Sequence, residues 1–342
     1  MKIKIWIGIL FFLCPFLGCA DQLNLYIWAR QIPNKILQQF TEETGITVNL
    51  SAYDSNEIMY AKLKSGPNPG YDIISPSTYF IPKLQRSGLL YPLDKAKIPN
   101  FKHLDPKFLS QAYDPENHYS IPIQWGATGI FLNRSLIPQR SVHTWAEIWD
   151  PQYQHQLVIL DDVREVFAIG LIKCGYSPND EDPEHLQEAY QMLKKLRHNI
   201  KLYNSNAIET LVTDEDVTVG MAWNATIAKT QIENSAIQFI YPKDGYAIWI
   251  DSLAILKDAP HKAAAHTFIN FILRPDISAK LVILELFPVP NLSAQDQVPV
   301  HLRNNTTLFP DLETLSRGTI LVEISAKAMA TLEDYWEHLR IN

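Results

Sequence analysis

The chain has 342 residues, of which 46% are hydrophobic and 20% charged, a composition typical of globular proteins and not of disordered ones. Its 37 acidic and 30 basic residues give a net charge of −7, which argues against a nucleic-acid partner because phosphate binding requires a basic surface. Three cysteines are too few for a disulfide scaffold or a cysteine-rich metal fold, and the length predicts two lobes, since domains usually have about 100–200 residues.

The first twenty residues have the features of an export signal. Lys2 and Lys4 precede an apolar run over residues 5–17, and small residues follow it. That run is shorter than the ~20 residues needed to span a bilayer. Two cleavage sites fit: one after Ala20, and one before Cys19, where Leu-Gly-Cys resembles a bacterial lipobox and the thiol would carry a lipid anchor. We therefore expect a periplasmic protein with residues 1–20 as its signal peptide.

Strand and helix patterns alternate directly after the signal. The patterns predict strands over 23–28, 46–52 and 71–75, and helices over 33–44, 55–63 and 79–86. Proline near the first helix start and Gly45 at its end agree with this assignment. Such an order is typical of a mostly parallel sheet with helices on both faces.

A second α/β series of similar size follows. It comprises strands over 156–160, 217–223 and 249–256, and helices over 163–174, 183–197, 225–233, 261–273, 275–285 and 325–339. Two such series predict two lobes, which we assign to residues 21–125 plus 250–295 and to residues 126–249 plus 296–342. We expect the chain to cross between them near 124–127 and 249–253. The cleft between the lobes is the natural ligand site.

Catalytic machinery is not evident in the sequence. It contains no dinucleotide, P-loop, nucleophile-elbow or zinc-protease motif, and its ten histidines lack ligand spacing. The carboxylates Asp162 and Glu165 have the spacing of a helix cap, and the same pair would suit a cation site or, less readily, acid–base catalysis. Cap and site are compatible, because a helix that follows a strand begins where ligands bind. We expect no enzyme, no cofactor and no metal site.

Aromatic residues recur at the ends of the predicted strands, beside polar or acidic ones. They are Trp28, Tyr79 with Ser77 close by, Trp223, and Trp249 with Asp251 on the same strand face. A single aromatic residue is usually part of a core. Several at such junctions, together with carboxylates, predict a pocket for an organic cation. Each ring attracts an ammonium by about 0.5–2 kcal/mol, and carboxylates form strong charge-assisted hydrogen bonds.

Ordered motifs run through the whole mature chain, among them FTEETG (40–45), YDII (71–74), DDVREVF (161–167), GMAWN (220–224), WIDSLA (249–254) and NFILRPD (270–276). In these motifs the sequence resembles the bacterial periplasmic spermidine/putrescine-binding proteins, which supply an ABC importer. The resemblance implies a two-lobed periplasmic-binding-protein fold of type II. It also implies a polyamine cleft lined by Trp28, Ser77, Tyr79, Asp162, Glu165, Trp223, Trp249 and Asp251, and by Phe287 where the family carries a tyrosine.

Four further positions differ from the family's pattern. After the first-strand tryptophan the family usually has a hydroxyl residue, an acid and a tyrosine, where this sequence has Ala29, Arg30 and Gln31. Leu321 stands where the family has glutamine. An arginine that points into the cleft would repel an ammonium, whereas a solvated one outside it would not. The preferred amine therefore stays open between spermidine, putrescine and a modified or unrelated amine.

We expect the substrate-binding component of a polyamine ABC import system. Its partners would be the amine and a permease in the inner membrane, and the protein itself would be a monomer. Ligand contacting both lobes would favour their closure. Two other functions fit the sequence: an amine sensor without a role in transport, and a secreted hydrolase that uses Asp162 and Glu165.

Overall fold

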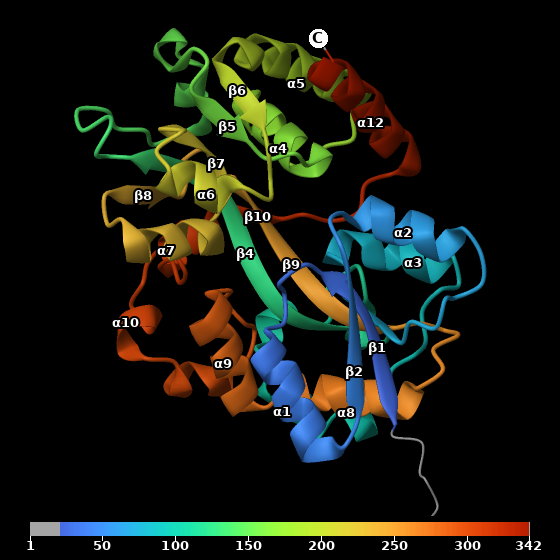
Figure 1. The fold of residues 1–342 in the computed structure, drawn as a ribbon. Coiled ribbons are helices and arrows are strands. Elements are labelled where there is room, and N and C mark those ends of the chain that lie inside the picture. Colours follow the sequence, from blue (N-terminus) through green and yellow to red (C-terminus); the bar gives the residue numbers. More distant parts are fainter. Residues whose placement is uncertain (1–20, 342) are drawn as a thin grey trace, which may run out of the picture.

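The computed structural model describes residues 21–341, and it has two lobes joined by a pair of long strands (Figure 1). The predicted signal peptide and Cys19 lie outside the described residues. Ten strands form one continuous, curled sheet in which most neighbouring pairs are parallel, and helices pack around it. The predicted two-lobed α/β class is confirmed. Within residues 21–341, no helix combines the length and hydrophobicity needed to cross a membrane.

Three parallel strands in the order β2-β1-β3 form the centre of the first lobe. They are β1 (Gln22–Trp28), β2 (Thr47–Tyr53) and β3 (Ile73–Ile74). The helices of this lobe are α1 (Asn34–Thr44), α2 (Asn56–Lys64), α3 (Ile81–Arg86), α8 (Lys262–Ile272) and α9 (Pro275–Glu285). The predicted strand over 71–75 is shorter than expected, and the helix predicted from residue 79 begins as a 3-10 turn.

The second lobe repeats this plan with the parallel order β7-β5-β6. Its strands are β5 (Leu157–Ile159), β6 (Ile200–Tyr203), β7 (Val219–Trp223) and β8 (Ile237–Ile240). Its helices are α4 (Val163–Lys173), α5 (Pro183–Leu196), α6 (Ile208–Thr213), α7 (Asn224–Glu233) and α12 (Ala326–Ile341). In both lobes the carboxyl ends of parallel strands point towards the space between the lobes (Figure 1).

Two long antiparallel strands, β4 (Ser120–Asn133) and β9 (Tyr246–Ile255), connect the lobes. Ile121 of β4 belongs to the first-lobe core and Ile130 to the second-lobe core. Between them, Trp125 packs with Tyr246 and Ile250 in a small central cluster. This cluster lies between the two lobe cores, so we propose that bending at it moves one lobe relative to the other.

Sequence patterns predicted neither β4 nor β6, β8 and the short β10 (Gly318–Ile320). Every residue of β4 is buried, so the strand lacks the alternation that marks a half-exposed one. Pro122 also argues against a central strand, and a β-bulge between Pro122 and Gln124 accommodates it.

The lobe boundary predicted at residue 296 is wrong, because the chain stays with the first lobe well beyond it. Val298, Leu302 and Leu308 are buried in the first-lobe core, together with Leu321. Only from Ile324 onwards does the chain join the second core. The short helices α10 (Val300–Arg303) and α11 (Leu312–Ser316) lie within this stretch. Hydrophobic periodicity locates helices but does not indicate which core they cover, and we now propose a boundary near residue 322.

Candidate ligand-binding site

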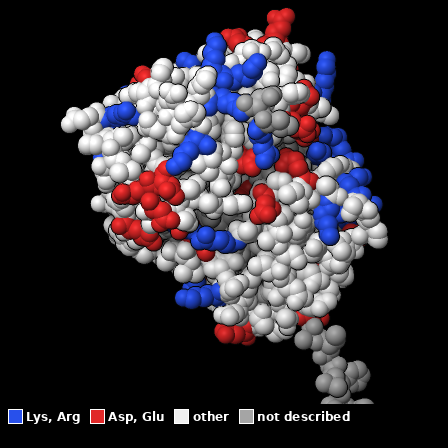
Figure 2. Space-filling view, turned by 45° about the horizontal axis from the view of Figure 1, so that its top comes forward, with Lys and Arg blue, Asp and Glu red and all other residues white. Residues whose placement is uncertain are grey.

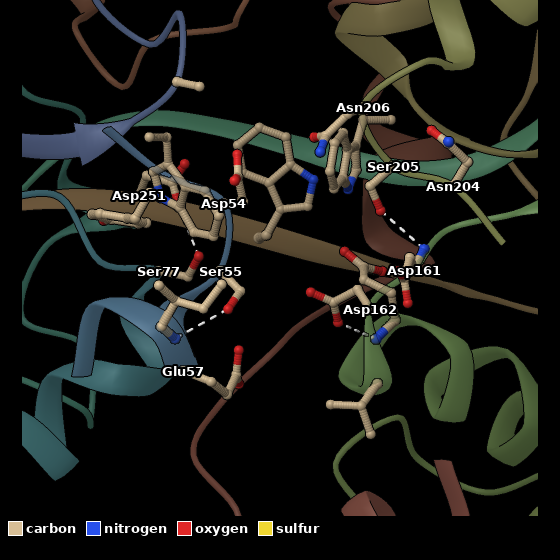
Figure 3. Close-up of a pocket in the computed structure, with 18 of the residues that line it drawn as sticks. Asp54, Ser55, Glu57, Ser77, Asp161, Asp162, Asn204, Ser205, Asn206 and Asp251 are labelled. Atoms are coloured by element: carbon tan, nitrogen blue, oxygen red, sulfur yellow. Dashed lines mark hydrogen bonds between the residues drawn. The ribbon is translucent and has the colours of Figure 1, made fainter. Parts of the chain in front are cut away.

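One cavity of about 560 Å³ lies between the lobes, a size common for small-molecule sites. Asp251 and Ser77 lie on one side of it, and Asp161 and Asp162 face them from the other (Figure 3). All nine residues expected to form the site line this cavity: Trp28, Ser77, Tyr79, Asp162, Glu165, Trp223, Trp249, Asp251 and Phe287. Residues from both lobes therefore meet at a single place.

Asp251 on β9 is held by a network of buried polar side chains. Its Oδ1 accepts a hydrogen bond of 2.8 Å from the Ser77 hydroxyl. Asn56 fixes the neighbouring segment, because its Oδ1 accepts from the Ser77 N–H and its Nδ2 donates to the Tyr79 hydroxyl. Burial raises the pKa of Asp251 to about 7, since no cation compensates the desolvated carboxylate. A cationic ligand would supply the missing charge.

Asp162 and Glu165 form the start of α4 at the opposite side of the cavity. Asp162 accepts a 3.0 Å hydrogen bond from the Glu165 N–H, which confirms the predicted helix cap. Glu165 itself is 4% exposed, and its Oε2 has no hydrogen-bond partner. Burial and then the Asp162 charge raise the pKa of Glu165 to about 8. A buried carboxylate oxygen without a partner is costly, so this oxygen is ready to accept from a ligand.

Aromatic rings cover the wall between the two acidic ends. The Trp249 ring lies edge-to-face against Trp223, with centroids 6.5 Å apart, and against Phe287 at 5.9 Å. Trp28 contacts Tyr53 at 4.8 Å on the first-lobe side. Gly126 lies directly opposite Trp249 on β4, and any Cβ there would overlap the indole. The glycine therefore lets this ring lie across the crossing strand.

Seven carboxylates line the cavity, and the one basic side chain among its lining residues is Arg340. Arg340 lies 3.5 Å from Asp161, so its charge is partly compensated. In the space-filling view, acidic side chains gather beside the hollow in the middle of this face (Figure 2). The acidic residues are Asp54, Glu57, Asp161, Asp162, Glu165, Asp251 and Glu333. No three His, Cys, Asp or Glu side chains of residues 21–341 are arranged to hold a metal ion together.

Glu57 at the start of α2 in the first lobe interacts electrostatically with carboxylates of the second lobe. Burial, together with the charges of Asp162 and Glu333, raises the pKa of Glu57 to about 7. Asp162 and Glu333 belong to the second lobe, whereas Glu57 belongs to the first. Like charges thus face each other across the cleft, and a cation between them would remove this repulsion.

Of the four positions that differ from the family's pattern, two line the cavity and two do not. Ala29 and Gln31 line the cavity. Arg30 does not; its side chain is 71% exposed and lies 3.8 Å from Glu209. Leu321 is buried in the first-lobe core and does not line the cavity either. Arg30 therefore does not place a positive charge in the cavity wall, where it would repel the ammonium group of a ligand.

Several lining residues escaped the sequence analysis. They are Tyr53, Asp54, Ser55, Glu57 and Ile58 after β2, Asn204, Ser205 and Asn206 after β6, and Glu333, Trp336 and Arg340 on α12. The group after β2 follows a predicted strand end, so the rule used for Trp28 would have found it. The group after β6 follows a strand that was not predicted, and the α12 residues reach the cavity only through tertiary packing.

The fold and the cavity define a class: a two-lobed solute-binding protein that encloses its ligand between lobes. A family model of bacterial extracellular solute-binding proteins matches residues 35–308, and the chain belongs to this family. The chain is 40% identical to the spermidine/putrescine-binding periplasmic protein of Escherichia coli K12 over 94% of its length and 92% of that protein. The predicted resemblance to spermidine/putrescine-binding proteins is confirmed.

Solved structures agree with the sequence relatives. A spermidine/putrescine ABC transporter substrate-binding protein from Streptococcus pneumoniae superposes with a TM-score of 0.82 at 32% identity, covering 94% of this chain and 99% of that one. A lipoprotein of Treponema pallidum gives a TM-score of 0.85 at 28% identity, with coverage of 94% and 100%. Both similarities extend over the whole described fold.

Proposed function

We propose that this protein is the substrate-binding component of a polyamine ABC import system and that it captures protonated spermidine or putrescine between its lobes. The observation that carries the proposal is the alternation of carboxylates and aromatic rings around one cavity, with seven acidic side chains against a single arginine. A polyamine is a flexible hydrocarbon chain with widely spaced ammonium groups. Acidic ends joined by an aromatic wall match that chemistry.

Each part of the site has a role in this proposal. Asp251 binds an ammonium group at one end, with Ser77 orienting its carboxylate. Asp162 and Glu165 bind another at the start of α4, where the free Oε2 of Glu165 accepts a hydrogen bond. The methylene groups lie against the rings of Trp28, Tyr79, Trp223, Trp249 and Phe287. These residues hold the ligand and make or break no covalent bond, so the protein is a binder and not an enzyme.

Ligand binding and lobe closure are coupled through charge. Without ligand, Glu57 in the first lobe faces Asp162 in the second, and their repulsion favours an open cleft. A cation between them stabilises the closed state, and β4 and β9 supply the bending segment. The closed monomer then presents surfaces of both lobes to an inner-membrane permease.

Export of the protein follows from its N-terminal sequence. We place the mature protein in the periplasm, with residues 1–20 acting as the signal peptide. Cys19 provides a thiol for a lipid anchor if cleavage precedes it. A relative of known structure, from Treponema pallidum, is a lipoprotein.

Isothermal titration of the purified mature protein tests the function directly. Spermidine and putrescine are expected to bind with one site per monomer, because one cavity carries the acidic and aromatic groups. Lysine and glutamate serve as amino-acid controls and are expected to bind far more weakly, since their carboxylates would enter an acidic cavity. No heat with any polyamine would reject the assignment.

Replacing Arg30 by alanine is expected to change polyamine affinity by less than about threefold. Its guanidinium is 71% exposed and lies outside the cavity, and its ion pair with Glu209 of the second lobe is solvent-exposed, so its loss should change both ligand contact and lobe closure little. The measurement is a titration of Arg30→Ala and the unmodified protein under the same ionic conditions. A gain in affinity of tenfold or more would mean that this side chain reaches into the cleft.

A further inference from the structure

The Gln31 side chain is buried in the cavity wall without any hydrogen-bond partner. It is 3% exposed, and neither its Nε2 nor its Oε1 is paired. Two indole N–H groups of the same wall, those of Trp28 and Trp249, are also buried and unpaired. Buried polar groups in proteins are almost always paired, so these atoms indicate where a ligand makes its contacts.

Gln31 lies at the Asp251 end of the cavity. Its backbone N–H donates to the carbonyl of Trp28, and its own carbonyl accepts from the side chain of Gln124. Gln124 in turn lies directly opposite Asp251 in the pairing of β4 with β9. A donor, an acceptor and a carboxylate are thereby gathered at one end of the site.

A bare ammonium group does not match this set of atoms. Protonated amines carry only N–H donors, so an ammonium can pair with Gln31 Oε1 and Asp251 but not with Gln31 Nε2 or the two indoles. Three buried donors would stay without an acceptor. A secondary amide offers one carbonyl acceptor and one N–H donor, which is the complement of a carboxamide side chain, and so supplies an acceptor for one of these three donors, Gln31 Nε2.

Gln31 and its neighbour Arg30 add no charge to the Asp251 end of the cavity. Arg30, which directly precedes Gln31, does not line the cavity, and its guanidinium lies 3.8 Å from Glu209 of α6. The side chain of Gln31 is itself neutral, whereas the start of α4 contributes both Asp162 and Glu165 to the cavity. The two ends therefore suit different groups of one ligand.

We propose that Gln31 determines ligand specificity and that the site takes a mono-N-acylated polyamine, with its acyl amide on Gln31 and its ammonium groups on the carboxylates. This inference rests on the proposed polyamine-binding function. The carbonyl of the ligand accepts from Gln31 Nε2, and the amide N–H of the ligand donates to Gln31 Oε1. Asp251, Asp162 and Glu165 bind the charged remainder.

Titrations with four ligands test the proposal: putrescine, N-acetylputrescine, spermidine and N1-acetylspermidine. The unmodified protein is expected to bind each acetylated amine at least as tightly as its parent. Gln31→Met, which keeps the length and removes both amide atoms, is expected to lose about tenfold for the acetylated amines and less than threefold for the parents. Gln154→Met, at an exposed position outside the cavity, is the matched control and should change neither.

A second variant, Gln31→Glu, tests the same contact independently, so that misfolding of Gln31→Met would not leave the proposal untested. Gln31→Glu keeps the side-chain shape but lacks the N–H donor, so it should weaken acetylated amines and strengthen their parents. Parent amines that bind tenfold or more tightly than acetylated ones to the unmodified protein would overturn the inference and leave the proposed function intact. Equal losses for both ligand classes in Gln31→Met would also overturn it. Failure of all four amines to bind would overturn the proposed function as well.

Discussion

An Asp251→Asn variant is expected to bind spermidine at least tenfold more weakly than the unmodified protein, a loss of about 1.5 kcal/mol or more. The carboxylate lies at one end of the cavity and is 8% exposed. Replacing it by an amide turns a charge-assisted hydrogen bond to the ammonium into a neutral one. Because the site excludes most water, solvent compensates little of this loss.

The substitution should leave the fold unchanged. An asparagine Oδ1 can still accept the hydrogen bond from the Ser77 hydroxyl, which in the unmodified protein measures 2.8 Å. The variant also removes a carboxylate whose burial is unfavourable, so the melting temperature of the unbound protein at pH 8 should be no lower. Asp296→Asn is a matched control, because that side chain is 93% exposed and lies outside the cavity.

Titration calorimetry of both variants gives the comparison. If Asp251→Asn kept full affinity while folding normally, Asp251 would not touch the ligand, and the acidic end of the site would have to be sought elsewhere. A loss in Asp296→Asn equal to that in Asp251→Asn would show that overall charge, and not the local contact, sets the affinity.

The sequence predicted residues that line the cavity better than it predicted the path of the chain between the lobes. Trp28 and Trp223 were found because they close strands, and the carboxyl ends of parallel strands meet at one edge of a sheet. Asp162 was found because a helix cap follows a strand at the same edge. These are local signals with a fixed spatial meaning.

Features that depend on tertiary packing could not be predicted in this way. β4 is buried throughout and contains a proline, so neither periodicity nor propensity marks it as a strand. Glu333 approaches the cavity only because α12 packs back on the second lobe. Arg30 and Gln31 are neighbours with opposite orientations, and the left-handed conformation of Arg30, with φ of 63°, accompanies this difference. No spacing rule distinguishes their directions.

Spermidine affinity is expected to fall about five-hundredfold when the pH is lowered from 8 to 6, about fiftyfold from Glu165 and about tenfold from Asp251. An ammonium binds an ionised carboxylate, and burial raises the pKa of Glu165 to about 8 and that of Asp251 to about 7. Below its pKa, each such group must release a proton on binding, which costs up to about tenfold in affinity per pH unit. Alkylamines keep their protons over this range, since their pKa is about 10.

The stability of the unbound protein should change in the opposite direction. Glu165, Asp251 and Glu57 have raised pKa values in the folded state, so the folded protein holds more protons than the unfolded chain above about pH 4. Their contribution to stability is complete below the unfolded pKa and is lost as the pH rises through about 7 to 8. The rise in melting temperature on adding spermidine is therefore expected to be larger at pH 8 than at pH 6.

A variant of Glu165, whose pKa is the highest of the three, identifies the source of the effect. Glu165→Gln should bind more weakly at pH 8, and its affinity should fall only about tenfold between pH 8 and pH 6, because one titrating group is gone. Glu313→Gln, at a side chain that is 89% exposed, should keep the full dependence. Equal affinities at the two pH values in the unmodified protein would contradict this prediction, because they would mean that no cavity carboxylate loses a proton on binding between pH 6 and pH 8.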